Sequence, residues 1–573
     1  MVDDELDAAF RAGRHQEVVA RAWDAASATW SVTRAPFVIG SLALLGRVDE
    51  AHALATRTMH DASTPPGVRV EVVFFAVVGA CHTGRYAEAL QWTRRLAEQA
   101  RDPEPRTRFF VYQGIALLRY FTSRMDAARR ASKRALHEAV LSGFAFGRLL
   151  ALDLRGHVLV QRGEVNAGLR VLDQAASLAG TLGAEGHRAA IESAKLAYQN
   201  RHGRRDETLE AALSEVAAST VDNLYAHRAA WHELAFRAAL VGDAERAREA
   251  LERGAELALA DADYRARARY FTTHAFVSRL DRRPDDVGSA LRNAAAALVG
   301  RDDRVLFAEV ALWDAWLGAR TIDMPHDAAH RLARSTGTFF ARVNESLRGG
   351  APLGLAEEEE SPLWGTLAGR APRQERAERA IARGWLGTLP TLFGVTSGRH
   401  VFFVGEHVVV DDRGSLTLIG RLPGHGRALL EALASAERSK ESLVAEVWNV
   451  PRYAPHLHDA VVHTAIARLR RALGPAQEWL RTTPSGYALD AVDLVSSGVV
   501  VEAAPSEASG EGESDPLEER VLGAIGKGHE RVPELASALD VSAATVLRRL
   551  RTLQAQGRVV REGSGKGTRY RLP

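Results

Sequence analysis

A chain of 573 residues is too long for one hydrophobic core, so it predicts several domains. Its composition, 46% hydrophobic and 25% charged, is that of an ordinary soluble protein, and a net charge of +2 says little about its partners. A single cysteine, Cys81, excludes an intrachain disulfide framework. The acidic start MVDDELDAAF lacks the pattern of a signal peptide, and no stretch approaches the roughly 20 apolar residues of a membrane span. We therefore expect a cytoplasmic protein with no membrane contact.

Residues 1–347 repeat a turn and the start of a helix about every 40 residues, as in LGRVDEAHAL, TGRYAEAL and VGDAERAREAL. The expected turn positions are Gly13, Gly46, Gly84, Ser123, Gly163, Gly203, Gly242 and Arg283. Glycine at such a turn ends a helix, and a small residue about five positions later lets neighbouring helices pack closely. These small residues include Ala51, Ala89, Ala128 and Ala247. Because one helical hairpin cannot bury its own apolar face, the pattern predicts an α-solenoid of stacked hairpins.

These hairpins resemble tetratricopeptide-like repeats, and GRYAEAL, from Gly84 to Leu90, is the nearest match. The spacing exceeds the roughly 34 residues of that family, and its full consensus is missing. The resemblance implies a concave surface that binds a peptide, a small molecule or a protein, or that forms a homodimer. Aromatic side chains of this region are expected to fill the core instead of contacting a ligand: Phe74, Phe75, Phe109, Phe110, Tyr112, Trp231, Trp313 and Trp316.

Residues 348–391 are expected to join the repeats to the next domain. The sequence RGGAPLGLAEEEESP, from Arg348 to Pro362, breaks the helical pattern with Gly, Pro and an acidic run, and it predicts a linker. Residues 374–385 predict a short coupling helix, for which a plain spacer is the alternative.

The pattern then changes from helices to strands and back. The segments VFFVGEHVVVDD and SLTLIG predict short strands around turns at Gly405 and Gly414. Two helices are expected next, over residues 424–435 and 439–448, and Ser439 is placed to cap the second.

The stretch HLHDAVVHTAIARLRRALG, which ends at Gly474, predicts a helix with one apolar stripe: Val462, Ile466, Leu469 and Leu473. Its other face is small and basic. A short side chain lets a helix approach the floor of a DNA groove, and arginine pairs with guanine edges or phosphates. A β-hairpin follows, in which WLRTT and YAL flank a Pro-Ser-Gly turn.

This helix and hairpin resemble the OmpR/PhoB-type winged-helix domain of bacterial transcription regulators. The helix matches at Val462, Ile466, Arg468, Leu469, Arg470, Leu473 and Gly474, and the wing matches at Leu480, Arg481, Thr482, Gly486, Tyr487 and Leu489. The resemblance implies a winged helix over residues 392–495, with DNA contacts from His463, Thr464, Ala467, Arg468, Arg471, Thr482, Thr483 and Tyr487. It also implies a surface for RNA polymerase at Arg452 and Tyr453, with a purely structural loop as the alternative.

Two features depart from this family. The segment LPGHGR, from Leu422 to Arg427, replaces the usual helix start, and the domain has about as many acidic as basic residues. Because Lys and Arg supply most of the non-specific affinity for DNA, this domain alone is expected to bind DNA weakly.

A second DNA-binding unit is expected at the C-terminus. Residues 496–515 are rich in Ser, Gly and Glu and predict a flexible tether, and residues 516–573 predict three helices and two strands. This part resembles the MarR/GntR/IclR-like winged helices at Leu535, Ala536, Leu539, Ser542, Thr545, Val546, Arg548, Leu550, Leu553, Gly557 and Val559.

The second resemblance implies that Ser542, Thr545, Arg548 and Arg551 face a major groove, and that Lys566 and Arg569 of the wing reach phosphate or the minor groove. The unit is basic, so it is expected to supply much of the electrostatic affinity. A winged helix that contacts proteins is the alternative.

No pattern for catalysis, a cofactor or a metal is found. GSGKGT, from Gly563 to Thr568, lacks the first glycine of a phosphate-binding loop, and His456, His458 and His463 match no common zinc spacing. We therefore expect no enzyme, cofactor or metal site. The sequence predicts a mainly α protein, an α-solenoid followed by two winged helices, that regulates transcription on double-stranded DNA under control of a ligand, peptide or protein at the solenoid. The alternative is a scaffold whose solenoid and winged helices bind proteins.

Overall fold

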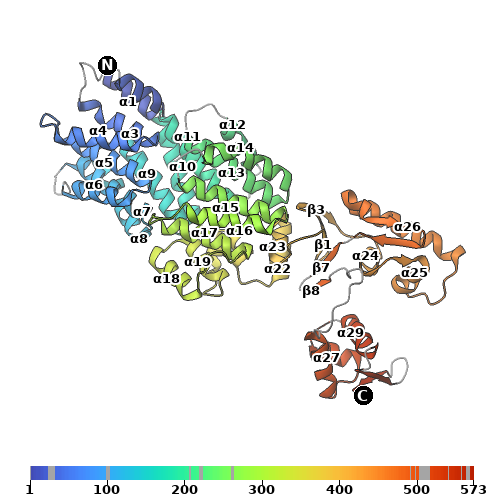
Figure 1. Cartoon of the computed structure of the whole chain (residues 1–573). Helices are drawn as coiled ribbons and strands as arrows, with labels where there is room; N and C mark the ends of the chain where they lie inside the picture. Colours follow the sequence, from blue (N-terminus) through green and yellow to red (C-terminus); the bar gives the residue numbers. More distant parts are fainter. Residues whose placement is uncertain are drawn as a thin grey trace. The chain divides into compact units, whose positions relative to one another are not determined.

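The computed structural model describes residues 2–23, 32–98, 104–204, 208–218, 224–259, 264–490, 492–496, 499–501, 516–539, 541, 543–555, 558–562 and 568–572. The chain forms two compact units, Met1–Ala503 and Ala504–Pro573, and each is described by itself. It is mainly helical, with small sheets toward its C-terminus (Figure 1). Over the described residues, no helix is long and apolar enough to cross a membrane.

The first unit begins with a helical region in which consecutive helices pack against one another (Figure 1). Its helices are α1 (Val2–Arg11), α2 (His15–Trp23), α3 (Ala35–Leu44), α4 (Val48–His60), α5 (Pro66–His82), α6 (Tyr86–Glu98), α7 (Pro105–Phe121), α8 (Met125–Leu141), α9 (Ala145–Gln161), α10 (Val165–Thr181), α11 (Glu185–Arg201), α12 (Leu209–Ala218), α13 (Leu224–Val241), α14 (Ala244–Leu259), α15 (Tyr264–Leu280), α16 (Pro284–Ala296), α17 (Arg304–Leu317), α18 (His326–Thr336) and α19 (Phe339–Leu347), with the short helix η2 (Val32–Arg34) before α3.

The two helices of a hairpin differ in how much of their surface they bury. Helix α5 buries Val72, Val73, Phe74, Phe75 and Ala76 in sequence, so side chains around its whole circumference are covered. Helix α6 buries only one stripe, which comprises Tyr86, Ala89, Trp92, Thr93 and Leu96. A helix that is apolar all round lies inside and an amphipathic helix lies outside, so α5 belongs to an inner layer and α6 to an outer one.

At seven of the eight expected turns, a residue with positive φ joins the two helices of one hairpin. These residues are Gly13, Gly46, Gly84, Ser123, Gly163, Gly203 and Gly242. The eighth prediction, Arg283, was wrong by one residue, because the positive φ of 61° belongs to Arg282. Pro284 begins α16 and restricts the residue before it to an extended conformation, which Arg283 adopts with φ −112° and ψ 78°. The small residues Ala51, Ala89, Ala128 and Ala247 are buried, which confirms the close packing of the helices.

Later parts of the helical region lie against the turns of earlier hairpins. Hydrogen bonds join the two parts in chain order: Arg301 donates to Thr83 O (2.9 Å), Val305 N to Ser123 Oγ (2.8 Å), Arg342 to Arg162 O (2.8 Å) and Leu363 N to His202 O (3.1 Å). At the other end, α1 contacts α11, and a Cβ added to Gly13 would lie 2.7 Å from the Cα of Gly186. The helical region is therefore closed by contacts between distant hairpins.

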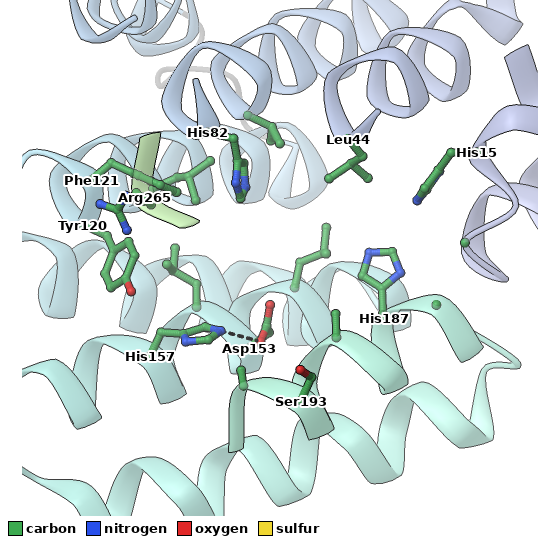
Figure 2. A pocket seen from close by; sticks show the side chains of 18 of the residues that line it. His15, Leu44, His82, Tyr120, Phe121, Asp153, His157, His187, Ser193 and Arg265 are labelled. Atoms are coloured by element: carbon green, nitrogen blue, oxygen red, sulfur yellow. Dashed lines mark ion pairs between the residues drawn. The ribbon is translucent and has the colours of Figure 1, made fainter. Parts of the chain in front are cut away.

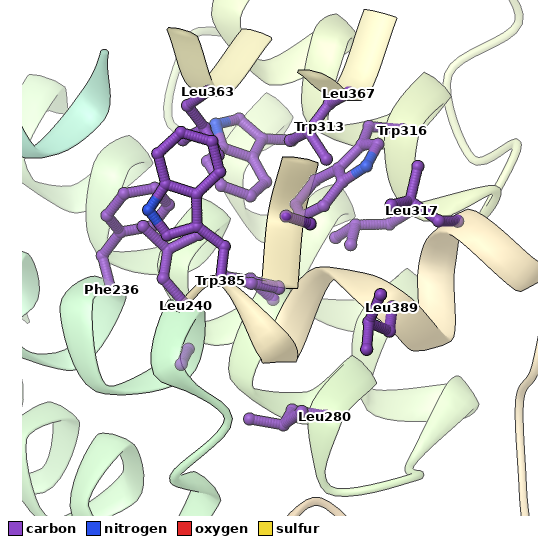
Figure 3. Packing of buried hydrophobic residues seen from close by; sticks show 14 of the residues in the cluster. Phe236, Leu240, Leu280, Trp313, Trp316, Leu317, Leu363, Leu367, Trp385 and Leu389 are labelled. Atoms are coloured by element: carbon purple, nitrogen blue, oxygen red, sulfur yellow. The ribbon is translucent and has the colours of Figure 1, made fainter. Parts of the chain in front are cut away.

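The segment 348–391, which was expected to join the repeats to the next domain, packs into the core, and its predicted linker part, Arg348–Pro362, contributes the buried Leu353. It contains α20 (Leu355–Glu360), α21 (Pro362–Ala368), α22 (Arg373–Ala382), η4 (Leu386–Thr388) and α23 (Leu389–Phe393). Figure 3 shows Leu363, Leu367 and Trp385 of this segment packed against Trp313 and Trp316 of α17. Gly, Pro and Glu dominate the composition of Arg348–Pro362, whereas apolar residues, most of them after Pro362, determine how the whole segment packs. The short helix expected over residues 374–385 is present as α22.

A five-stranded sheet follows, with strand order β3-β2-β1-β7-β8. Its strands are β1 (His400–Val404), β2 (His407–Asp412), β3 (Ser415–Gly420), β7 (Asp493–Ser496) and β8 (Val499–Val501). The expected turns at Gly405 and Gly414 join β1 to β2 and β2 to β3. Strand β7 returns from the far end of the domain and pairs in parallel with β1, which the sequence did not predict. Strand β8 lies within residues 496–515, which were predicted as a flexible tether, so that prediction was wrong for Val499–Val501, and residues 502–515 lie outside the described residues.

The two faces of the sheet belong to different cores. Phe402 and Val404 of β1 pack with the apolar cluster of the helical region, as do Val409 of β2 and Leu416 of β3. Val401 and Phe403, which point the opposite way, pack with the helices that follow the sheet. Leu416 N also donates to Gly242 O at the end of α13 (2.9 Å), so the edge strand β3 is bonded to the helical region. The sheet is thus a shared layer between the two parts of the first unit.

Three helices and a hairpin complete the first unit. They are α24 (Gly426–Ser435), α25 (Lys440–Trp448), α26 (Pro455–Leu473), η5 (Gly474–Trp479), and a small sheet of order β4-β6-β5 made of β4 (Arg438–Ser439), β5 (Leu480–Thr482) and β6 (Gly486–Leu489). Both helices expected before α26 are present, and Ser439 Oγ caps α25 by accepting from Ser442 N (3.1 Å).

The second unit has the same order of elements: α27 (Pro516–Gly526), α28 (Val532–Leu539), α29 (Ala543–Ala555), β9 (Val560–Glu562) and β10 (Arg569–Arg571), with β9 and β10 antiparallel. The expected stripe of α29, Val546, Leu550 and Leu553, is fully buried. It packs with Val521 of α27 and Leu535 of α28, so the three helices enclose one small core.

Candidate functional sites

Helix α26 begins and ends where its sequence dictates. Pro455 stands in its first turn, where a missing N–H costs nothing, and His458 Nδ1 accepts from the Ala454 N–H (2.9 Å). The helix ends at Gly474, which has a φ of 55°. The residues of the predicted apolar stripe are each at most 1% exposed: Val462, Ile466, Leu469 and Leu473. Burial of this stripe fixes which face of α26 remains in solvent.

The solvent face of α26 carries five of the residues predicted to contact DNA: His463, Thr464, Ala467, Arg468 and Arg471, all exposed. Within the described part of the chain, neither Arg468 nor Arg471 has an ion-pair partner. Thr464 and Arg468 also border a cavity of about 400 Å³ with Pro423 and His425 of the LPGHGR segment. This face therefore presents two unpaired guanidinium groups on a helix with small neighbouring side chains.

The hairpin after α26 is tied to that helix by side-chain hydrogen bonds. Arg470 donates to Leu480 O (2.7 Å) and to Thr482 Oγ1 (2.9 Å). Tyr487, predicted to contact DNA, is instead 2% exposed, and its hydroxyl lies 2.7 Å from Nδ1 of His463. Because its ring fills the core, Tyr487 holds His463 in place and does not itself reach the surface.

The tip of this hairpin is hydrogen-bonded to Glu437, which precedes β4. Thr483 Oγ1 donates to Oε1 of Glu437 (2.6 Å), and Ser485 Oγ donates to the same oxygen. The hydrogen bonds from Ser485 and Thr483 lower the pKa of Glu437. The hydroxyl of Thr483 is therefore engaged, and Thr482 remains the more exposed of the two predicted wing threonines.

The loop predicted to face RNA polymerase is joined to α26 by a side-chain hydrogen bond. The Tyr453 hydroxyl donates to Asp459, and Lys440 Nζ lies 2.9 Å from the other oxygen of that carboxylate. The hydrogen bond to Asp459 raises the pKa of Tyr453 to about 12. Arg452 is exposed. Tyr453 thus joins this loop to α26, whereas no such contact is found for Arg452 in the described part of the chain.

Few of the residues predicted in the second unit can be placed. Ser542 and Lys566 lie outside the described residues, as do the side chains of Arg548 and Arg551. Thr545 is half-buried on α29. Arg569 lies 3.5 Å from Oε2 of Glu530, so its guanidinium already has a carboxylate partner.

A cavity of about 520 Å³ lies inside the helical region, for which no specific site residues were predicted. Figure 2 shows Arg265, Tyr120 and Phe121 at one side of it, His15 and His187 at the other, and Asp153 between His157 and His187. Its walls come from helices of several hairpins: α1, α2, α3, α5, α7, α9, α11, α13 and α15. The stacked helices of the region thus surround a pocket.

The pocket has apolar walls with single polar groups among them. Phe74 and Phe75, predicted as core residues, are buried as expected and also line this pocket. Polar residues recur on the inner helices, one turn or so from apolar wall residues: His82, Tyr120, Asp153, His157 and Tyr198. A polar residue on an otherwise apolar helix face was the signal in the sequence that could have located the pocket.

No group of three or more His, Cys, Asp or Glu side chains that could hold a metal ion is found among the residues for which the structure gives side chains. Two histidines of α26 illustrate how such side chains have separate partners. His458 caps the helix and His463 is bonded to Tyr487, so the two act separately.

Comparison with known proteins adds no relative: no protein family matches the chain, and no curated protein matches it. The two sites described above therefore carry the functional argument.

Proposed function

We propose that this protein is a DNA-binding transcription regulator, in which α24–α26 with their hairpin and α27–α29 with theirs act as two winged helices. One observation carries the proposal: the exposed face of α26 presents Arg468 and Arg471, unpaired in the described structure, beside the small residues Thr464 and Ala467. Such a helix fits the major groove, where arginine pairs with guanine or phosphate. The hairpin bonded to α26 through Arg470 lies where a wing contacts the DNA backbone.

The second unit supplies positive charge for this function. From Pro516 to Pro573 it has 11 Lys and Arg residues against 6 Asp and Glu. Several of these arginines form ion pairs, among them Arg558 with Glu519 and Arg571 with Glu530. The net positive charge still favours phosphate, because affinity for DNA rises with each phosphate that is neutralised. Two units on one chain raise each other's effective concentration on a long binding site.

We further propose that the helical region, a closed form of an α-solenoid, controls these units through a ligand in its pocket. Helix α13 brings His232 to the pocket and ends at Gly242, which bonds to β3. Helix α15 brings Arg265 and Arg269 to the pocket and is followed by Arg282, which pairs with Asp411 of β2. The same two helices therefore contact both the pocket and the shared sheet, so a ligand that shifts these helices also shifts the sheet.

The first test is selection of binding sites from a randomised duplex library by the full chain, followed by fluorescence anisotropy on the selected duplex. Replacement of both Arg468 and Arg471 by Ala is expected to weaken binding at least about tenfold and to lower the slope of log affinity against log salt by about 2. The matched control is Arg331→Ala, because Arg331 is also exposed on a helix, α18, but lies in the helical region. Failure to select any duplex, or a double variant that behaves like the control, would overturn the proposal in favour of a protein-binding scaffold.

A further inference from the structure

The pocket of the helical region has the size of a small-molecule site. Its volume of about 520 Å³ lies within the range of about 300–1,000 Å³ that is typical of such sites. A pocket of this volume has no room for a folded partner. The nature of its ligand therefore follows from the side chains inside it.

Asp153 of α9 presents a carboxylate to this cavity. Its Oδ1 atom is buried and faces His157, whereas the side chain as a whole is 30% exposed, so the exposed part includes its other oxygen. His157 Nε2 lies 3.2 Å from Oδ1, and the ring is held from its other side by Tyr198, whose hydroxyl lies 2.7 Å from Nδ1. Asp153 is thus fixed in position, with one oxygen left for a ligand.

The cationic groups around the pocket do not neutralise this carboxylate. Arg265 lies 2.6 Å from Oδ2 of Asp303, and Arg269 lies 3.6 Å from Oε2 of Glu309. Each arginine therefore has its own carboxylate partner. The charge of Asp153 is not matched by either of them.

Four of the histidines that line the pocket are uncharged at neutral pH. Burial lowers the pKa of His15 and of His82 to about 4, and burial also lowers the pKa of His187 and of His232. A neutral imidazole gives no positive charge to balance a carboxylate. Among the described side chains of the pocket, the neighbour of Asp153 within ion-pair distance is therefore a histidine, His157, and not an arginine.

The rest of the lining suits a cation with an apolar body. The aromatic rings of Phe74, Phe75, Tyr120 and Phe121 line the cavity, and ring faces attract cations. Leucine side chains, including Leu44, Leu117 and Leu150, complete the wall. We propose that the pocket binds a small organic amine, with its ammonium group on Asp153 and its apolar body against the phenylalanine and leucine side chains. This deepens the function proposed above, since the amine would be its input, but the binding step itself does not depend on DNA.

The test is isothermal titration calorimetry of the full chain at neutral pH without DNA. The probes are tryptamine and phenethylamine, each compared with the alcohol that has a hydroxyl in place of the amine, and indole-3-propionate as a carboxylate of similar shape. Both amines are expected to bind at least about tenfold more tightly than their alcohols, because a hydrogen bond to a charged group is worth about 1.5–3 kcal/mol. Asp153→Asn should abolish this preference.

The matched control is Asp327→Asn, which removes an exposed carboxylate on α18 and should keep the preference for amines. Circular dichroism and thermal unfolding establish that both variants are folded. Equal binding of amine and alcohol, preference for the carboxylate, or no binding of either amine at millimolar concentration would overturn the proposal.

Anisotropy on a DNA duplex separates this proposal from the previous one. Amine binding that leaves DNA affinity unchanged would support the pocket assignment and contradict ligand control of the DNA-binding units. A chain that binds no DNA but distinguishes amines from alcohols would overturn the proposed function alone.

Discussion

Arg282 and Asp411 form a buried ion pair between the helical region and the sheet. Arg282 follows α15 and its side chain is 6% exposed, whereas Asp411 lies in β2 and is 0% exposed. The other carboxylate oxygen of Asp411 accepts from the Gly414 N–H (2.8 Å). His400 of β1 is also close, with its Nδ1 3.5 Å from Asp411. A positive charge from one part of the first unit is thus enclosed with a negative charge from the other.

Loss of one member of this pair should destabilise the first unit strongly. Arg282→Met or Asp411→Asn leaves a buried charge without its partner, at a cost of about 3–5 kcal/mol in the free energy of unfolding. The free energy of unfolding should fall clearly less in the double variant than the sum of the two single losses, because the double variant leaves no unpaired charge. Urea denaturation followed by circular dichroism measures all three.

The neighbouring pair Arg399 and Asp412 provides the control for that experiment. Its atoms lie 3.0 Å apart, but the side chains are 29% and 49% exposed. Asp412→Asn should therefore cost at most about 1 kcal/mol. If Asp411→Asn were as mild as Asp412→Asn, the ion pair would not fasten the sheet to the helical region.

Acid should destabilise the first unit through its buried histidines. Burial lowers the pKa of His202 to about 3 and that of His400 to about 4, from an ordinary value of 6.5. Between pH 6.5 and these values the unfolded chain binds protons that the folded chain does not, so the free energy of unfolding falls as the pH falls. Above about pH 7 these two residues should contribute no pH dependence.

Urea denaturation at several pH values measures this effect. His400→Gln should reduce the loss of stability between about pH 6.5 and 4, because glutamine takes up no proton. His407→Gln is the control, since His407 lies exposed on the neighbouring strand β2. An unchanged acid response in the His400 variant would contradict this assignment.

Tyr487→Phe should weaken DNA binding without exposing a new surface. The change removes the hydroxyl 2.7 Å from His463 Nδ1 but keeps the ring in the core. A lost hydrogen bond of this kind costs about 0.5–1.5 kcal/mol, which corresponds to a roughly two- to tenfold loss of affinity if His463 must be held in place. Anisotropy on the selected duplex measures it, and His463→Ala should then make the Tyr487 substitution nearly silent. Additive losses from the two changes would show that the hydroxyl acts elsewhere.

The features that the sequence predicted correctly are local ones. The turn glycines, the apolar stripe of α26 and the cap at Ser439 each depend on residues within a few positions of one another. The composition of residues 348–362 did not reveal that Leu353 is buried, or that Trp364 and Leu367 just after them pack against Trp313 and Trp316, about 50 positions earlier in the chain.

The features that the sequence did not reveal depend on contacts between distant segments. The parallel pairing of His400 with Asp493 joins strands on either side of three helices, and no local pattern marks it. The pocket requires helices from α5 to α15 to close around Asp153. In the sequence of α9 alone, Asp153 and His157 have the spacing of an ordinary side-chain pair one helical turn apart.

Gly387 should be needed for the contact between η4 and the end of α13. A Cβ built on Gly387 would overlap the carbonyl oxygen of Ala239, which belongs to α13. Because backbone cannot yield as a flexible side chain does, Gly387→Ala should cost about 1–3 kcal/mol or more in the free energy of unfolding. Gly67→Ala in α5 is the matched control, since no atom lies within 4 Å of the added carbon, and it should stabilise the chain by up to about 1 kcal/mol. Helix α13 also reaches the pocket through His232. A Gly387 variant that still folds should therefore bind the amine, but amine binding should change its DNA affinity less than in the unaltered chain. If both glycine variants unfolded alike, the close contact of η4 with α13 would have no part in holding the helical region to the sheet.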